Sequence, residues 1–367
     1  MAEFLYAYGL FFLKVLTLVI AIIVIIMAIV AAATRNRQLG SGSSDGHIRI
    51  RKYNERLEDL EQALSLSLMD PAEQKKAEKE RKKAEKAEKK QAKAAAKKAS
   101  KQRGSGETIL PEDKRHRLYV LDFDGDVRAS EVEKLRREIT AVLTTATSDD
   151  EILLRLESGG GMVTSYGLAA SQLDRIRDRK IPLTISVDKV AASGGYMMAC
   201  VADKLLAAPF AVLGSIGVVA QIPNFHRLLK ELNIDFELLT AGKYKRTLTL
   251  FGENTDEGRQ KFIEDIERIH ASFKKYVGER RPQLDIEKVA TGEIWSGDDA
   301  LNLSLVDRLV TSDQYMIEAC EERDVLVLSY KEKRKLLERF SLAVQNTIDG
   351  VVIRWIERLW KSRFSIG

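Results

Sequence analysis

The stretch VAASGGYMMAC, Val190 to Cys200, places one serine among small residues and follows it with two glycines. A serine in such a run is ordinarily a small residue that allows close packing, but it can also be a nucleophile at the start of a helix. A bare serine hydroxyl is a weak nucleophile and needs a base nearby. The stretch therefore indicates either a packing motif or a catalytic Ser193, depending on whether the chain supplies that base.

Strand and helix patterns alternate on both sides of this stretch. The candidate strands are RLYVLDF (117–123), EILLRLES (151–158), LTISVD (183–188), KLLAAP (204–209) and DFELLTA (235–241). Helical patterns lie between them, for example over 165–179 and 256–279. This alternation predicts an α/β domain with a largely parallel sheet over residues 107–312. The apolar run after Val190 is broken by Asp203 and Lys204 and is interpreted as buried core, not as a membrane span.

Residues 1–34 predict a transmembrane anchor that contacts lipid. Val15 to Ala33 is a run of 19 residues without a charge, long enough to cross a bilayer core as a helix. A cleaved signal peptide is the alternative, because Ala31–Ala33 resembles a cleavage site. The run is longer than a typical signal core and lacks a basic leader, so we expect an uncleaved anchor.

Two further segments flank the predicted domain. Residues 35–106 form a connector rich in Ala, Lys and Glu, interpreted as a solvated spacer or as a basic arm against anionic lipid. Residues 313–367 form an extension in which apolar residues recur at helical spacing from Ile348 to Trp360. That amphipathic helix is predicted to pack on its own domain or a sister subunit, or to lie in the membrane interface.

Charge and cysteine content exclude several classes of function. The excess positive charge is concentrated in the second half of the connector, Pro71 to Arg103, which has no interleaved aromatic residues, so nucleic-acid binding is not predicted. Cys200 and Cys320 are too few for a disulfide framework, and neither a CxxC motif nor a Cys/His cluster indicates a metal site. The cysteine pattern therefore predicts no metal site.

The base for Ser193 is not evident among the four histidines, His47, His116, His226 and His270, each of which fits a surface position. A GxSxG elbow is also absent, because Ala191 stands where its first glycine would be. A lysine can act as the base when burial lowers its pKa. Lys245 in LLTAGKYKRTLTLFGENT is a candidate, and Lys243 and Arg246 are close competitors that spacing alone does not exclude.

The segments ASGGY, GSIGVV and AGKYKRTLTLFGENT together resemble the signal-peptide-peptidase-A family of bacterial membrane serine peptidases, its SohB branch in particular. The resemblance covers residues 107–312 in detail, and the anchor and basic connector also look like that branch. It implies a ClpP/crotonase-like fold of repeated ββα units. It also implies a Ser-Lys dyad, whose mechanism requires neither a metal nor an organic cofactor.

Five residues take roles from this resemblance. Ser193 matches the nucleophile, Lys245 the general base, and Ser215 the serine that orients that lysine. Gly160, in ESGGGMVTS, matches one oxyanion donor, and the backbone N–H of Gly194 would be the other. The physical requirements agree: glycines let a backbone approach the developing oxyanion, and a neutral lysine can accept the serine proton.

The implied function is a membrane-anchored serine endopeptidase that cleaves signal-peptide remnants or unfolded chains through an acyl-enzyme. The resemblance also implies a homo-oligomeric ring in the bacterial inner membrane. The sequence does not decide whether Lys245 serves its own chain or a neighbour. It also leaves open the side of the membrane that the domain faces, because the basic connector favours the cytoplasm and the family favours the opposite side.

Two departures and two alternatives accompany this prediction. Ser304 stands where the family commonly has a glycine, and Gly159 stands where ClpP-like proteins often have proline. A crotonase-like enzyme binding acyl-CoA is one alternative, although no carboxylate is evident near the glycine loop. A catalytically inactive membrane scaffold is the other, which the presence of Ser193, Ser215 and Lys245 disfavours.

Overall fold

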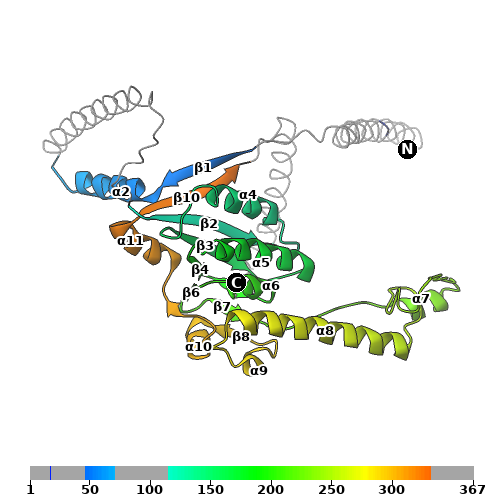
Figure 1. Cartoon of the computed structure of the whole chain (residues 1–367). Helices are drawn as coiled ribbons and strands as arrows, with labels where there is room; N and C mark the ends of the chain where they lie inside the picture. Colours follow the sequence, from blue (N-terminus) through cyan, green and yellow to red (C-terminus); the bar gives the residue numbers. More distant parts are fainter. Residues whose placement is uncertain (1–16, 18–45, 71–114, 332–367) are drawn as a thin grey trace, which may run out of the picture. The chain divides into compact units, whose positions relative to one another are not determined.

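The computed structural model describes Thr17 and residues 46–70 and 115–331, which are built around one ten-stranded sheet (Figure 1). The predicted anchor, apart from Thr17, lies outside the described residues, as do the second half of the connector and the C-terminal amphipathic helix. Within the described ranges, no helix has the length and apolar character needed to cross a bilayer.

The strands are β1 (His47–Lys52), β2 (Arg117–Gly125), β3 (Glu151–Ser158), β4 (Leu183–Val187), β5 (Val190–Ala192), β6 (Lys204–Ala207), β7 (Val212–Gly214), β8 (Ile294–Ser296), β9 (Arg308–Leu309) and β10 (Asp324–Lys331). The helices are α2 (Tyr53–Ser67), α4 (Val132–Val142), α5 (Val163–Asp178), α6 (Gly194–Ala199), α7 (His226–Glu231), α8 (Asp256–Arg280), α9 (Ile286–Val289), α10 (Gly297–Asn302) and α11 (Ser312–Glu322).

The sheet has the order β1-β10-β2-β3-β4-β6-β9, and β5, β7 and β8 branch from β3. The pairs from β10 through β2, β3, β4 and β6 to β9 are all parallel, whereas β7 and β8 pair antiparallel. The predicted α/β class with a largely parallel sheet is confirmed. Four of the five predicted strands are present, and the helices predicted over 165–179 and 256–279 correspond to α5 and α8.

Strand β2 shows why the sheet is covered on both faces. Tyr119, Leu121 and Phe123 join the main core with α4, α5 and α6, whereas Leu118 and Val120 pack with α11 on the opposite face. Side chains alternate across a strand, so an uninterrupted apolar run requires two buried faces. The apolar run after Val190 likewise lies in the main core, as predicted.

The sheet extends beyond the predicted domain limits of 107–312. β1 and α2 come from the predicted connector, and β10 comes from the predicted C-terminal extension. Asn54 at the start of α2 ties these segments together, since its side chain donates to the Arg323 carbonyl at 2.9 Å and accepts from the Val325 amide at 2.8 Å. Long-range pairing of this kind leaves no local signal in the sequence.

The strand predicted at 235–241 is wrong. This segment has no regular secondary structure, and every residue in it is exposed. Leu238 and Leu239 are apolar, but no strand of the described sheet lies beside them, so their backbone has no ladder to join.

Glu138 on α4 is a buried carboxylate that should make stability depend on pH. Its Oε1 accepts from the Tyr330 amide at 2.7 Å, whereas Oε2 has no hydrogen-bond partner among the described residues. Burial raises the pKa of Glu138 to about 7, although Lys134 opposes this. The folded state therefore binds this proton more tightly than the unfolded chain, whose pKa is near 4.5. The free energy of unfolding should fall as pH rises between these values.

Glu138→Gln should remove this dependence, because glutamine keeps the acceptor for Tyr330 and has no charge to desolvate. We expect stabilisation of about 1–3 kcal/mol at pH 8 and little change at pH 4.5. Urea unfolding at both pH values measures the difference. Glu133→Gln, at an exposed position on the same helix, is the matched control. An equal effect of Glu138→Gln at both pH values would contradict the assignment.

Candidate active site

Ser193 occupies a strained turn between β5 and α6. Its φ of 52° and ψ of −118° lie outside the regions that non-glycine residues normally adopt. The turn is held in place because the Ser193 amide donates to the Gly214 carbonyl at 2.8 Å and the Ser193 carbonyl accepts from the Met197 amide at 3.0 Å. The side chain is half-buried, and its hydroxyl has no hydrogen-bond partner within the described part of the chain. This geometry presents a free hydroxyl at a fixed position, as a nucleophile requires.

The glycine loop that follows β3 lies against this turn. Gly160 has a φ of +87°, and a Cβ there would lie 2.8 Å from the Ser193 Cβ and 2.7 Å from the Gly194 nitrogen. The amide of Gly160, a predicted oxyanion donor, donates to Ser158 Oγ at 3.1 Å. Its neighbour Gly161 lines the cavity beside Ser193, as does Gly194, the other predicted donor. The structure thus brings the nucleophile and the glycine loop together.

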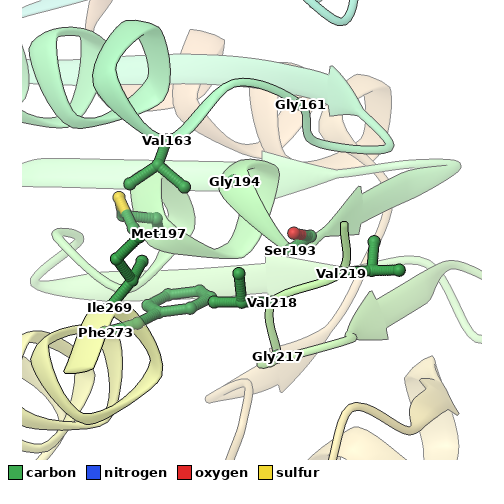
Figure 2. A pocket seen from close by; sticks show the side chains of 10 residues that line it. All are labelled: Gly161, Val163, Ser193, Gly194, Met197, Gly217, Val218, Val219, Ile269 and Phe273. Atoms are coloured by element: carbon green, nitrogen blue, oxygen red, sulfur yellow. The ribbon is translucent and has the colours of Figure 1, made fainter. Parts of the chain in front are cut away.

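A small apolar cavity of about 80 Å³ opens beside the serine (Figure 2). Figure 2 shows Val163 from α5, Met197 from α6 and Phe273 from α8 around one part of it, with Ser193 at its edge. Its lining comprises Gly161, Val163, Ser193, Gly194, Met197, Gly217, Val218, Val219, Ile269 and Phe273. The hydroxyl of Ser193 is the one polar side-chain group of this lining, so the cavity suits an apolar side chain.

Ser215 is near the nucleophile through the backbone. It follows Gly214, whose carbonyl accepts from Ser193, and its own amide donates to the Glu293 carbonyl at 2.6 Å. Its φ of 49° is also in the left-handed region. The same segment leads to Gly217 and the cavity.

Lys245 does not lie in the cavity. It is exposed and belongs to the segment joined to the first turn of α8, where Lys243 pairs with Glu257 at 2.6 Å. The cavity contacts α8 from Ile269 onward, 12 residues later, which is about 18 Å along the helix. Figure 1 shows the region around α7 beyond this end of α8, away from the sheet. Within one chain, the structure does not bring the predicted base to Ser193.

Other potential bases and nucleophiles do not replace it. His270 follows Ile269, but its Nε2 is engaged with the Ile216 carbonyl at 3.2 Å. Burial raises the pKa of Cys200 to about 12, so its thiol is not reactive. Among the residues that the structure describes, no three His, Cys, Asp or Glu side chains are grouped to hold a metal ion.

Several site residues had no signal in the sequence. Ile269 and Phe273 are four positions apart on one face of α8, which marks a packed face but does not say what it contacts. Tyr166 is fully buried behind the serine turn and lies in no recognisable motif.

Comparison with known proteins gives matches along most of the chain. The family model for the peptidase family S49 N-terminal region matches residues 3–173, and the peptidase family S49 model matches residues 175–326. A probable protease SohB of Haemophilus influenzae is 46% identical over 356 residues, covering 96% of each chain. A probable protease SohB of Buchnera aphidicola from Acyrthosiphon pisum is 54% identical over 246 residues, covering 67% of this chain and 73% of its own.

Proposed function

Since the chain belongs to peptidase family S49, with SohB proteases among its relatives, we propose that it is a membrane-anchored serine endopeptidase using a Ser-Lys dyad. The observation that carries the proposal is the strained turn that presents the unpaired Ser193 hydroxyl beside the Gly194 amide and an apolar cavity. Family membership confirms the predicted resemblance and disfavours the acyl-CoA-binding and inactive-scaffold alternatives.

In this mechanism, Ser193 Oγ attacks the carbonyl carbon of the scissile peptide bond while Lys245 takes its proton. The backbone amide of Gly194 stabilises the oxyanion. Because the Gly160 amide is occupied by Ser158, we assign the second donor to Gly161, whose backbone faces the cavity. The lysine then protonates the leaving amine and activates the water that releases the acyl group from Ser193.

The lysine comes from a neighbouring copy of the chain in this proposal. A base must lie within about 3 Å of the hydroxyl it deprotonates. The segment that carries Lys245 is instead joined to α8 12 residues, or about 18 Å, before the part of that helix that lines the cavity. A head-to-tail contact between copies repeats around a closed ring and places each lysine in the next site. Ser215 would hold that incoming lysine, since its segment borders the cavity.

The segment that carries Lys245 has the surface expected of an interface between copies. No residue from Val219 to Phe251 is buried. Leu239 is 89% exposed and Leu232 is 59% exposed, and neither is covered by the described residues. A segment that buries so little apolar surface cannot offset its own conformational entropy. A second copy seated on it would both order the segment and bury these side chains.

The substrate is proposed to be an extended, apolar peptide, such as a signal-peptide remnant or an unfolded chain. The cavity beside Ser193 would take an apolar side chain next to the scissile bond. The helix predicted at 15–33 would anchor the protein in the bacterial inner membrane, where such peptides are released. The parallel sheet with its glycine loop is in keeping with a ClpP/crotonase-like arrangement.

Labelling with a fluorophosphonate tests the proposal directly. We expect the full-length protein to be labelled and to cleave an apolar peptide, and Ser193→Ala to lose both properties, with activity lower by at least about 10³-fold. Ser171→Ala, which removes an exposed hydroxyl bonded to the Gly167 carbonyl on α5, is the matched control and should be labelled normally. A wild-type oligomer that is neither labelled nor active would overturn the proposal.

A further inference from the structure

Two separate loops must be held in register for the proposed oxyanion site to work, and one buried side chain contacts both. The glycine loop follows β3, whereas the Ser193–Gly195 turn follows β5. An oxyanion is stabilised only when its donors are fixed before the reaction. We propose that Tyr166 is a positioning residue that locks these two loops together through Ser158. This inference rests on the proposed peptidase function.

The ring of Tyr166 packs against the Ser193–Gly195 turn. Tyr166 lies on α5 and is fully buried. A Cβ on Gly194 would lie 2.5 Å from Tyr166 Cγ, so the ring packs directly against the backbone that carries the proposed donor. Phe123 holds the ring in turn, edge to face, with centroids 6.5 Å apart. Gly194 therefore rests on a rigid surface.

The hydroxyl of Tyr166 reaches the glycine loop. It donates to the Asp126 carbonyl at 2.7 Å. Ser158 Oγ therefore shares its own proton between Tyr166 Oη, 2.5 Å away, and the Gly125 carbonyl, 3.2 Å away. Ser158 Oγ is then free to accept from the Gly160 amide, at 3.1 Å. The chain of bonds holds the Gly160 amide, and the next residue, Gly161, lines the cavity. The position of the Gly161 amide, the proposed donor, therefore depends on these bonds.

The two loops also approach each other too closely for any side chain to separate them. A Cβ on Gly195 would lie 2.4 Å from the Ser158 carbonyl oxygen, and a Cβ on Gly125 would lie 2.6 Å from Tyr166 Oη. A small shift of Ser158 is therefore transmitted to the serine turn. Burial raises the pKa of Tyr166, so its hydroxyl stays protonated and keeps its donor role.

Tyr166→Phe tests the inference because it removes the hydroxyl and keeps the ring. We expect kcat for peptide cleavage to fall about 10-fold with KM within about twofold, because the transition state depends on the donors and the bound substrate does not. Ser158→Ala should act similarly, and the double variant should lose no more than either single one. Hydrogen–deuterium exchange of the segment 156–163 should accelerate in both.

Tyr196→Phe is the matched control. Its hydroxyl is equally buried and donates to the Leu305 carbonyl at 2.8 Å, but it has no bond to either loop. Tyr196→Phe should lower the melting temperature about as much as Tyr166→Phe does, but it should leave kcat and the hydrogen exchange of residues 156–163 unchanged. The inference would be overturned if Tyr166→Phe raised KM instead of lowering kcat, or if Tyr196→Phe lowered kcat to the same extent. An inactive wild-type enzyme would refute the proposed function instead, and the exchange measurement would still decide whether Tyr166 holds the loop.

Discussion

Mixing a Ser193→Ala chain with a Lys245→Ala chain is expected to restore about a quarter of wild-type peptidase activity, although each variant alone is inactive. In a head-to-tail ring, an active site needs Ser193 from one chain and Lys245 from its neighbour. When the two variants assemble at random in equal amounts, each site has an intact Ser193 with a probability of about one half and an intact Lys245 with a probability of about one half, so about one site in four is complete. Peptide hydrolysis after joint refolding or co-expression measures the recovery.

The physical basis is the separation of the two residues within one chain. Lys245 belongs to the segment held at the first turn of α8 by the Lys243–Glu257 pair, whereas the cavity begins near Ile269. Bending that rigid helix enough to bring the amine to the serine would break its continuous backbone hydrogen bonds. A second copy, as proposed, would supply the lysine without any distortion of the helix.

Arg246→Ala is the control for this experiment. Arg246 is exposed and lies next to Lys245, so its loss removes a neighbouring cation without removing the proposed base or the Lys243–Glu257 pair. This variant should be active by itself. If mixed rings that contain both chains by native mass spectrometry stay inactive, the base acts within its own chain or is another residue, and sharing between subunits is rejected.

The central strands were predicted correctly because their burial is indicated by the apolar residues of each strand itself. β2 and β3 contain the apolar runs Leu118–Leu121 and Ile152–Leu154, and such runs are typical of parallel strands covered on both faces. β1 and β10 were missed as parts of the domain, since their partners lie far away in the chain. The segment at 235–241 was predicted as a strand from its apolar residues, but these residues are exposed in the single chain and form no strand.

The candidate site was predictable to the extent that it is carried by glycines and a serine. Gly160 and Gly194 cluster with Ser193 because only glycine tolerates such close backbone contacts. The supporting residue Tyr166 left no trace in any motif, since its role depends on packing between α5 and the serine turn. In the proposed ring, the position of Lys245 relative to Ser193 would depend on the neighbouring copy, which the pattern of a single chain does not encode.

Gly160→Ala is expected to reduce kcat/KM by at least about 10²-fold while leaving the protein folded. The added methyl would lie 2.7 Å from the Ala192 carbonyl oxygen and 2.8 Å from the Ser193 Cβ. The Ala192 carbonyl belongs to strand β5, which the sheet holds, so the glycine loop must move away from Ser193. The backbone conformation adds strain of about 1–3 kcal/mol, because φ is +87°.

Gly159→Ala is a control only one residue away. A Cβ at Gly159 would meet nothing within 4 Å, and its φ lies outside the left-handed region. Steady-state cleavage and fluorophosphonate labelling should therefore be close to wild type for Gly159→Ala and nearly lost for Gly160→Ala. Thermal unfolding of the two variants separates loss of catalysis from loss of the fold. Substantial activity in Gly160→Ala would mean that the loop does not need its close approach to Ser193, and the oxyanion donor would then have to come from elsewhere.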